Sequence, residues 1–182
     1  ARISRLPWRK TKLCQQRTQS VFLVQTGDGK QQMADVVPAD VRSRMMAGIQ
    51  GKNTKPEILL RKGLHARGFR FRLHDKTLPG KPDIVLPRYR AVIFAHGCFW
   101  HGHDCHLFKW PSTRPEFWHA KIKRNREIDV SSLTILLEMG WRVGVVWECA
   151  LKGRSRLSLM DILADCEAWI KSSTIQIEIR GH

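Results

Sequence analysis

The sequence predicts an α/β domain in which a mixed β-sheet is flanked by helices. Amphipathic helical patterns alternate with short apolar runs between residues 40 and 170, and turn residues separate them. A chain of 182 residues is long enough for one domain with a substantial core. It has no apolar run approaching the roughly 20 residues of a transmembrane helix.

The expected elements follow in order along the chain. A short helix is expected over residues 40–49, and a second begins at Thr54-Lys-Pro-Glu57, which has capping-box spacing, and ends at Gly68. Alternation of Phe69, Phe71 and Leu73 with arginines predicts a half-exposed strand. Further elements are strands at 83–86, 90–95 and 141–147, a long helix at 115–139 and a last helix at 158–170.

Charge points to a polyanionic partner, with nucleic acid favoured over a membrane surface. The chain has 32 Lys and Arg against 16 Asp and Glu, a formal charge of +16. Residues 1–32 hold seven of the basic and one of the acidic residues, so the remaining chain still carries +10 (25 minus 15). We expect residues 1–32 to be a disordered basic extension and 33–182 to be the domain. Five cysteines without a secretory pattern favour a reducing, cytoplasmic location.

The tract from His96 to His106, HGCFWHGHDCH, predicts a metal site, because thiols and imidazoles crowd together there. Cys98, His103 and Cys105 are spaced to wrap one zinc ion, but a closed structural site needs a fourth ligand. Cys149 is the best candidate, since it follows the strand at 141–147. The alternative is that Cys149 is simply a small buried apolar residue.

A second, acidic site is expected at Asp83, which starts a buried strand. A carboxylate there is costly unless it binds a cation or is well hydrogen-bonded. The turn to the next strand brings Asp83 near the backbone of Ala95, so that carboxylate, carbonyl and water could hold Mg²⁺. Glu57 could assist, or it could simply close the capping box with Thr54.

Two histidines of the tract, His96 and His101, are left over once zinc takes His103. Imidazole suits softer ions than magnesium, so neither is expected to bind it. A role as proton acceptor for water fits their position beside a metal-type aspartate better than a purely structural role.

Loop aromatics suggest DNA contact. Phe99 and Trp100 stand between the expected metal ligands and Trp118 follows nearby; burial in the core is the alternative. In a basic domain such rings can enter a base stack. Basic and amide side chains of the adjoining helix are expected to contact DNA, unless they form a solvated face: Lys121, Lys123, Arg124, Asn125 and Arg126. These features predict a metal-dependent enzyme acting on phosphodiesters.

The run PGKPDIVLPRYRAVIFAHGCFWHGHDCHLFKWPSTRPEFW, with the later GWRVGVVWECAL, closely resembles the very short patch repair endonucleases of the Vsr type. The resemblance covers about residues 33–170. It implies a restriction-endonuclease-like fold and a Mg²⁺-dependent hydrolase that nicks DNA on one strand, 5′ of the thymine in a T·G mismatch left by deaminated 5-methylcytosine. It further implies a bacterial, nucleoid-associated monomer with mismatch-repair proteins as candidate partners.

The resemblance also implies roles for single residues. Asp83 matches the magnesium-binding aspartate and His101 the catalytic histidine, proposed as general base. Glu57 and Asp129 match accessory acidic positions, and His96 stands where relatives of the superfamily often have lysine.

Further matches concern the zinc site and the aromatics. The family's zinc ligands match Cys98, His103, Cys105 and Cys149. Phe99, Trp100 and Trp118 match aromatics that wedge into DNA. Ala95 departs from the threonine common in the family; if only its main-chain carbonyl binds magnesium, alanine preserves the site.

Two other functions stay open at this point. The first is a zinc-stabilised DNA-binding module without cleavage, which the presence of Asp83 and His101 disfavours. The second is a restriction-type nuclease that needs no mismatch, which the aromatic residues disfavour.

Overall fold

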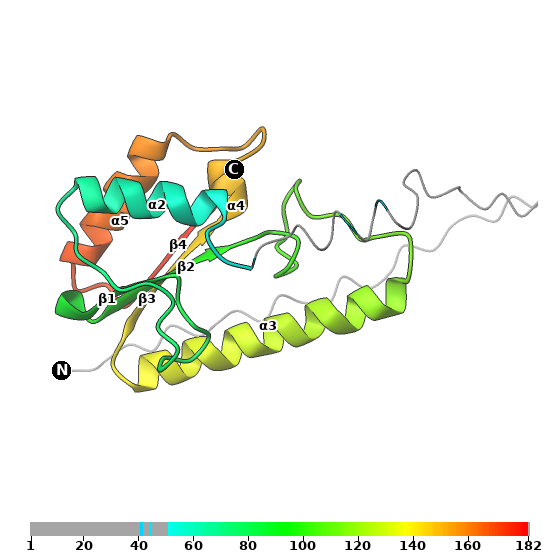
Figure 1. Ribbon diagram of the computed structural model, residues 1–182, viewed down its shortest axis with the longest axis horizontal. Helices are drawn as coiled ribbons and strands as arrows, with labels where there is room; N and C mark the ends of the chain where they lie inside the picture. Colours follow the sequence, from blue (N-terminus) through cyan, green and yellow to red (C-terminus); the bar gives the residue numbers. More distant parts are fainter. Residues whose placement is uncertain (1–40, 42–43, 45–50, 182) are drawn as a thin grey trace, which may run out of the picture. The chain divides into compact units, whose positions relative to one another are not determined.

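The computed structural model describes residues 41, 44 and 51–181 (Figure 1). The basic extension at 1–32 lies outside the described residues. So does most of the helix expected at 40–49, of which Val41 and Arg44 are described and helical.

A mixed sheet forms the centre of the fold, as the sequence predicts, and within the described residues it has four strands. Its strands are β1 (Ile84–Leu86), β2 (Ala91–His96), β3 (Arg142–Trp147) and β4 (Gln176–Ile179), in the spatial order β1-β2-β3-β4. β1 runs antiparallel to β2, whereas β2, β3 and β4 are parallel. β4 was not predicted, because its four residues alternate too briefly to stand out after a helix.

Helices cover both faces of this sheet (Figure 1). α2 (Lys55–Ala66) and α5 (Leu159–Lys171) lie on one face and α3 (Pro115–Glu138) lies on the other. Neighbouring strand residues point to opposite faces. Ile84 and Ile93 therefore pack with α2 and α5, and Val85 and Val92 with the α3 side.

One local expectation was wrong, and one short helix was not predicted. Residues 69–73 do not form a strand: Arg72 makes a single antiparallel bridge to Val85, and the chain turns away at His74, whose φ is +49°. Phe69 is buried in the core instead of lying on a half-exposed strand. A helical turn, α4 (Glu148–Leu151), follows β3 directly and was not predicted.

No helix in the described ranges is long and apolar enough to cross a membrane.

Candidate active site and metal centre

The predicted site residues gather at one edge of the sheet, where β2 and β3 end. His96 closes β2 opposite Trp147, which closes β3. Because β1 is antiparallel to β2, Asp83, the residue before β1, lies at this same edge. Loop 97–114 follows β2 and α4 follows β3, so the topology collects residues far apart in sequence. Such edges of α/β sheets commonly hold ligands.

Asp83 sits beside the backbone of Ala95, as the sequence predicts. The Ala95 N–H donates a hydrogen bond of 2.8 Å to Asp83 Oδ2. Burial raises the pKa of Asp83 to about 6; the Ala95 hydrogen bond opposes this shift and the nearby charge of Glu57 adds to it. A carboxylate held out of water in this way favours a cation that can replace its lost hydration.

Both roles considered for Glu57 are compatible with its position. Its Oε1 accepts a 3.3 Å hydrogen bond from the Thr54 N–H, which completes the predicted capping box. Its Oε2 forms an ion pair with Arg61. A ligand atom of Glu57, one of Asp83 and one of His74 also lie within 4.8 Å of one another. Glu57 thus begins α2 and faces the Asp83 site.

Sequence reasoning missed the contribution of Arg61 and His74. The Arg61 guanidinium is buried and its Nη2 lies 3.0 Å from His74 Nε2. The i, i+4 spacing of Glu57 and Arg61 was an available signal for their ion pair. No sequence pattern marks His74, because a loop positions it.

His101 is held by an acidic partner from α3. Its Nδ1 lies 2.5 Å from Asp129 Oδ2, although the two residues are 28 positions apart. The carboxylate fixes the tautomer with the proton on Nδ1, which leaves Nε2 as a proton acceptor. This is the arrangement of an oriented general base.

His96 packs flat against His101. The two rings are stacked with centroids 3.8 Å apart and an interplanar angle of 3°. Burial lowers the pKa of His96 to about 3, and the neighbouring His101 adds to the shift. His96 is therefore kept in its neutral form, and its ring covers one face of the His101 ring.

One face of α3 supports the loop that carries these groups. Asn125 lies one turn before Asp129 and donates a 2.8 Å hydrogen bond from Nδ2 to the carbonyl of Trp100. Arg126 Nε donates to the carbonyl of His101 at 3.2 Å. Asn125, expected at the DNA, thus uses one amide hydrogen to hold the loop. Lys121, Lys123 and Arg124 are exposed.

The four predicted zinc ligands form a second cluster. The donor atoms of Cys98, His103, Cys105 and Cys149 all lie within 4.8 Å of one another. His103 Nδ1 is 3.5 Å from both Cys98 Sγ and Cys149 Sγ. Cys149 is buried, as expected if it were simply a small apolar residue. Its sulfur, however, faces His103 and not an apolar core.

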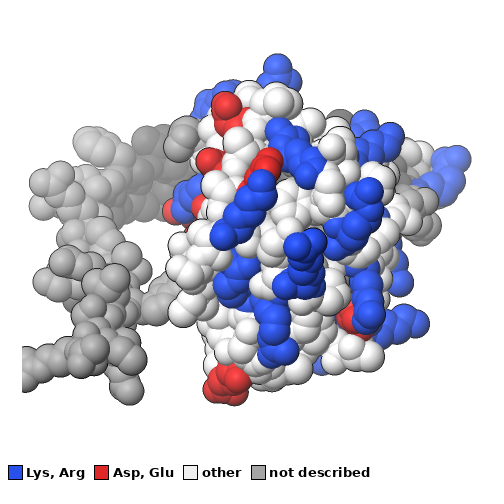
Figure 2. All heavy atoms as spheres, turned by 90° about the vertical axis from the view of Figure 1, so that its left-hand side faces the viewer, with Lys and Arg blue, Asp and Glu red and all other residues white. Residues whose placement is uncertain are grey.

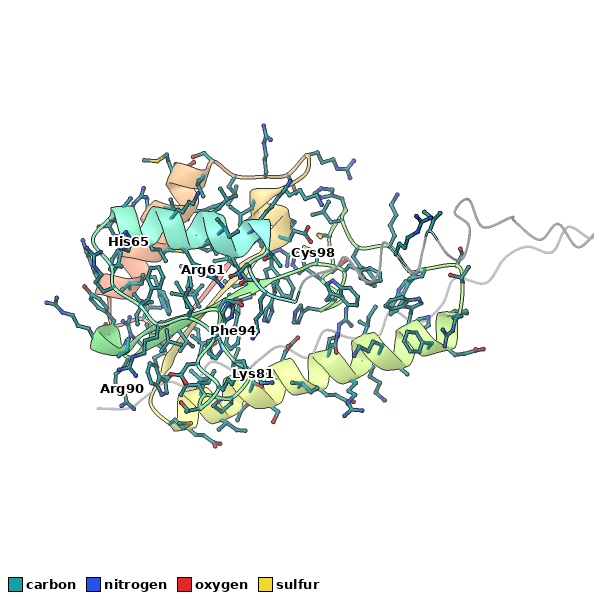
Figure 3. The ribbon with its side chains drawn as sticks, in the orientation of Figure 1. Arg61, His65, Lys81, Arg90, Phe94 and Cys98 are labelled. Carbon is teal, nitrogen blue, oxygen red and sulfur yellow. The ribbon has the colours of Figure 1, made fainter. Side chains whose placement is uncertain are left out.

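The chemistry of this cluster fits a bound cation. Three thiols and one imidazole match the donor set of a closed tetrahedral zinc site. Burial raises the pKa of the Cys98 and Cys149 thiols, so both are neutral unless a metal ion stabilises the thiolates. Figure 3 shows Cys98 on the loop after β2 and Arg61 on α2. Cys98 follows the last residue of β2 by two positions and Ala95, the partner of Asp83, lies in β2, so the Cys98 cluster and the Asp83 site both adjoin the end of this strand.

The loop aromatics form a partly exposed group beside the site. Phe99 lies 5.2 Å from Trp100 and 5.1 Å from Trp118 between ring centroids. All three rings are half-buried, and in the described part of the chain none belongs to either hydrophobic core. Their position does not agree with the core-burial alternative.

Comparison with known proteins places this geometry in context. The family model for DNA mismatch endonuclease Vsr matches residues 34–107. The DNA mismatch endonuclease Vsr of Escherichia coli K12 is 46% identical over 151 residues, which cover 82% of this chain and 97% of that protein. The type II nicking enzyme V.XorIIP of Xanthomonas oryzae is 48% identical over 119 residues, covering 65% and 88% of the two chains. V.NmeAIP of Neisseria meningitidis, also a type II nicking enzyme, is 47% identical over 123 residues, covering 68% and 88%.

Proposed function

The chain belongs to the Vsr family of DNA mismatch endonucleases, and we propose that it nicks one strand of DNA 5′ of the thymine in a T·G mismatch left by deaminated 5-methylcytosine. The observation that carries this proposal is the meeting of Asp83 and the His101–Asp129 pair at one sheet edge. The aromatic group of Phe99, Trp100 and Trp118 lies on the same loop and helix. A related mismatch endonuclease and related nicking enzymes support the same conclusion.

Asp83 is the proposed magnesium ligand, together with the main-chain carbonyl of Ala95 and water. Oxygen donors suit a hard cation, and the alanine in place of threonine leaves that carbonyl unchanged. When bound, magnesium would polarise the scissile phosphate and lower the pKa of its water. Glu57 would act on this site through its charge while Arg61 holds its carboxylate.

His101 is the proposed general base. Its Nε2 would accept a proton from the attacking water, and Asp129 would stabilise the resulting imidazolium through the Nδ1 hydrogen bond. His96, stacked on His101 and neutral, would keep the ring in this orientation. His96 therefore acts as a positioning residue in this proposal.

Recognition of the mismatch is assigned to the aromatic group. Phe99, Trp100 and Trp118 would enter the base stack beside the weakened pair. On α3, four residues would contact the backbone around it: Lys121, Lys123, Arg124 and Asn125.

The remaining assignments concern the rest of the molecule. A structural zinc ion would join loop 97–114 to α4 through Cys98, His103, Cys105 and Cys149. Residues 1–32 would be a basic extension and 33–182 the endonuclease domain. We place the enzyme in the bacterial cytoplasm at the nucleoid, as a monomer that cooperates with mismatch-repair proteins.

The test is incubation of the protein and magnesium with a T·G duplex and with matched T·A and C·G duplexes. The proposal expects a nick in the mismatched duplex that is absent from the matched ones and from reactions with Asp83→Ala. Equal cutting of matched DNA would instead indicate a restriction-type nuclease. Binding of mismatched DNA without cutting would indicate a DNA-binding module.

A further inference from the structure

The end of the sheet opposite the active site carries a dense group of cations. β2 and β3 start there with Ala91 beside Arg142 and end at the active-site edge with His96 beside Trp147. Six residues of extended chain separate the two edges by about 17 Å. Figure 2 looks onto the end of the molecule that bears β1 and the 3-10 turn Pro87–Tyr89, and Lys and Arg side chains spread across it with few carboxylates.

Contacts around Tyr89 show that these cations form one surface. Arg142 donates to the Tyr89 carbonyl at 3.0 Å, and the Arg88 guanidinium lies 5.8 Å from the Tyr89 ring centroid. The Tyr89 ring meets the Phe69 ring at 5.6 Å, and Lys171 Nζ lies 6.0 Å from the Phe69 ring centroid. We call this surface the Tyr89 face; its cations are Arg70, Arg88, Arg90, Arg142 and Lys171.

The bonds of these arginines leave their charge unneutralised. Arg70 donates to the carbonyl of Phe69, and Arg90 donates to the carbonyls of Met139 and Gly140. A carbonyl orients a guanidinium but leaves its charge in place, whereas a carboxylate would neutralise it. Among the residues that the structure describes, Glu167 is the carboxylate that pairs with this group, through Lys171 at 2.6 Å and Arg67 at 3.3 Å. With Arg67 included, six cations and one carboxylate leave +5, and still +4 if Glu138 at the end of α3 is counted.

Arginine dominates the face, and four of its cations are exposed: Arg70, Arg88, Arg90 and Lys171. The planar guanidinium matches phosphate oxygens in a bidentate manner, and it is held here by rings and carbonyls at low conformational cost. None of these residues takes part in the cleavage machinery proposed at the other edge.

We propose that the Tyr89 face is a second DNA-binding surface, which holds a separate duplex segment by its phosphates without reading bases. The enzyme would then contact two segments at once, one at the active-site edge and one about 17 Å behind it. Such a surface would let the protein pass between segments while it searches for damage. The inference goes beyond the cleavage reaction and does not depend on the identity of the mismatch.

The experiment counts duplexes bound per protein. The wild-type protein in magnesium-free buffer, where cutting is absent, is titrated with a short matched duplex and followed by sedimentation velocity and native mass spectrometry. Two duplexes per protein are expected. The variant Arg70→Glu/Arg88→Glu should lower the association constant of the second binding event at least about tenfold. For that event, the slope of log K against log salt concentration should fall in magnitude by about two.

A matched control is Arg154→Glu/Arg156→Glu, which changes the net charge equally with two exposed residues between α4 and α5. It should retain the second binding event, and both double variants should nick a short cleavable duplex as the wild type does. One duplex per protein in the wild type, or an equal loss in the control, would overturn the proposal. Failure of T·G nicking would leave this result readable, because the titration uses matched DNA.

Discussion

Replacing Asp83 by asparagine should abolish nicking and, at the same time, stabilise the protein in the absence of magnesium. Burial raises the pKa of Asp83 from 3.8 to about 6, so the folded state favours the protonated carboxyl. Because the pKa of Asp83 is higher in the folded than in the unfolded state, the protonated carboxyl stabilises the fold. This contribution to the free energy of unfolding is complete below about pH 4 and is lost as the pH rises through about 6. Raising the pKa from 3.8 to about 6 corresponds to about 3 kcal/mol in the free energy of unfolding. Asparagine keeps an oxygen for the Ala95 N–H but cannot ionise.

The measurement is urea unfolding of wild type and Asp83→Asn at about pH 4 and about pH 8, in magnesium-free buffer without chelators, with each variant compared with the wild type at the same pH. The variant should gain up to about 3 kcal/mol at the higher pH and little at the lower one. Added magnesium should stabilise only the wild type. Asp75→Asn is the control: hydrogen bonds from Thr77 lower the pKa of that carboxyl, so this variant should lose stability at about pH 8 instead of gaining it. Equal stability of Asp83→Asn and wild type at about pH 8 would show that the ionised Asp83 carboxylate does not destabilise the fold.

Four further outcomes are expected. Trp100→Ala should reduce discrimination between mismatched and matched DNA more than it reduces stability; a loss of about 3–5 kcal/mol with discrimination intact would support core burial instead. Removal of zinc by a strong chelator should lower the Tm, and metal analysis that finds no zinc would contradict the assignment of Cys98, His103, Cys105 and Cys149. Deletion of residues 1–32 should leave nicking nearly unchanged and weaken salt-sensitive binding to matched DNA, whereas lost catalysis would place the extension in the site. Asp129→Asn should lower kcat by at least about a hundredfold with KM little changed, because His101 loses its orienting charge; a change confined to KM would argue against that role.

Local patterns predicted the elements that position the site. The capping box before α2, the proline that starts α3 and the glycine that follows it mark boundaries that depend on neighbouring residues alone. The adjacency of Asp83 and Ala95 was also predictable, because a short antiparallel turn fixes which residues face each other.

What the sequence could not supply were contacts set by tertiary packing. The pairing of His101 with Asp129 and the stacking of His96 on His101 require α3 to lie under the loop after β2. The Arg61–His74 contact depends on a loop that turns at His74 with a positive φ. This turn directly follows residues 69–73, which were expected to form a strand. The short β4 becomes a strand because β3 offers it a parallel edge, which no local pattern reveals.

The most direct test of the central claim is nucleotide-resolution mapping of the cut. A duplex with one T·G pair, labelled differently on its two strands, is incubated with the protein and magnesium and resolved beside a size ladder. We expect one product, from the strand that contains the mismatched thymine, broken immediately 5′ of that thymine, with the guanine strand intact. Cuts in both strands, or cuts at the same positions in the matched duplex, would contradict this expectation.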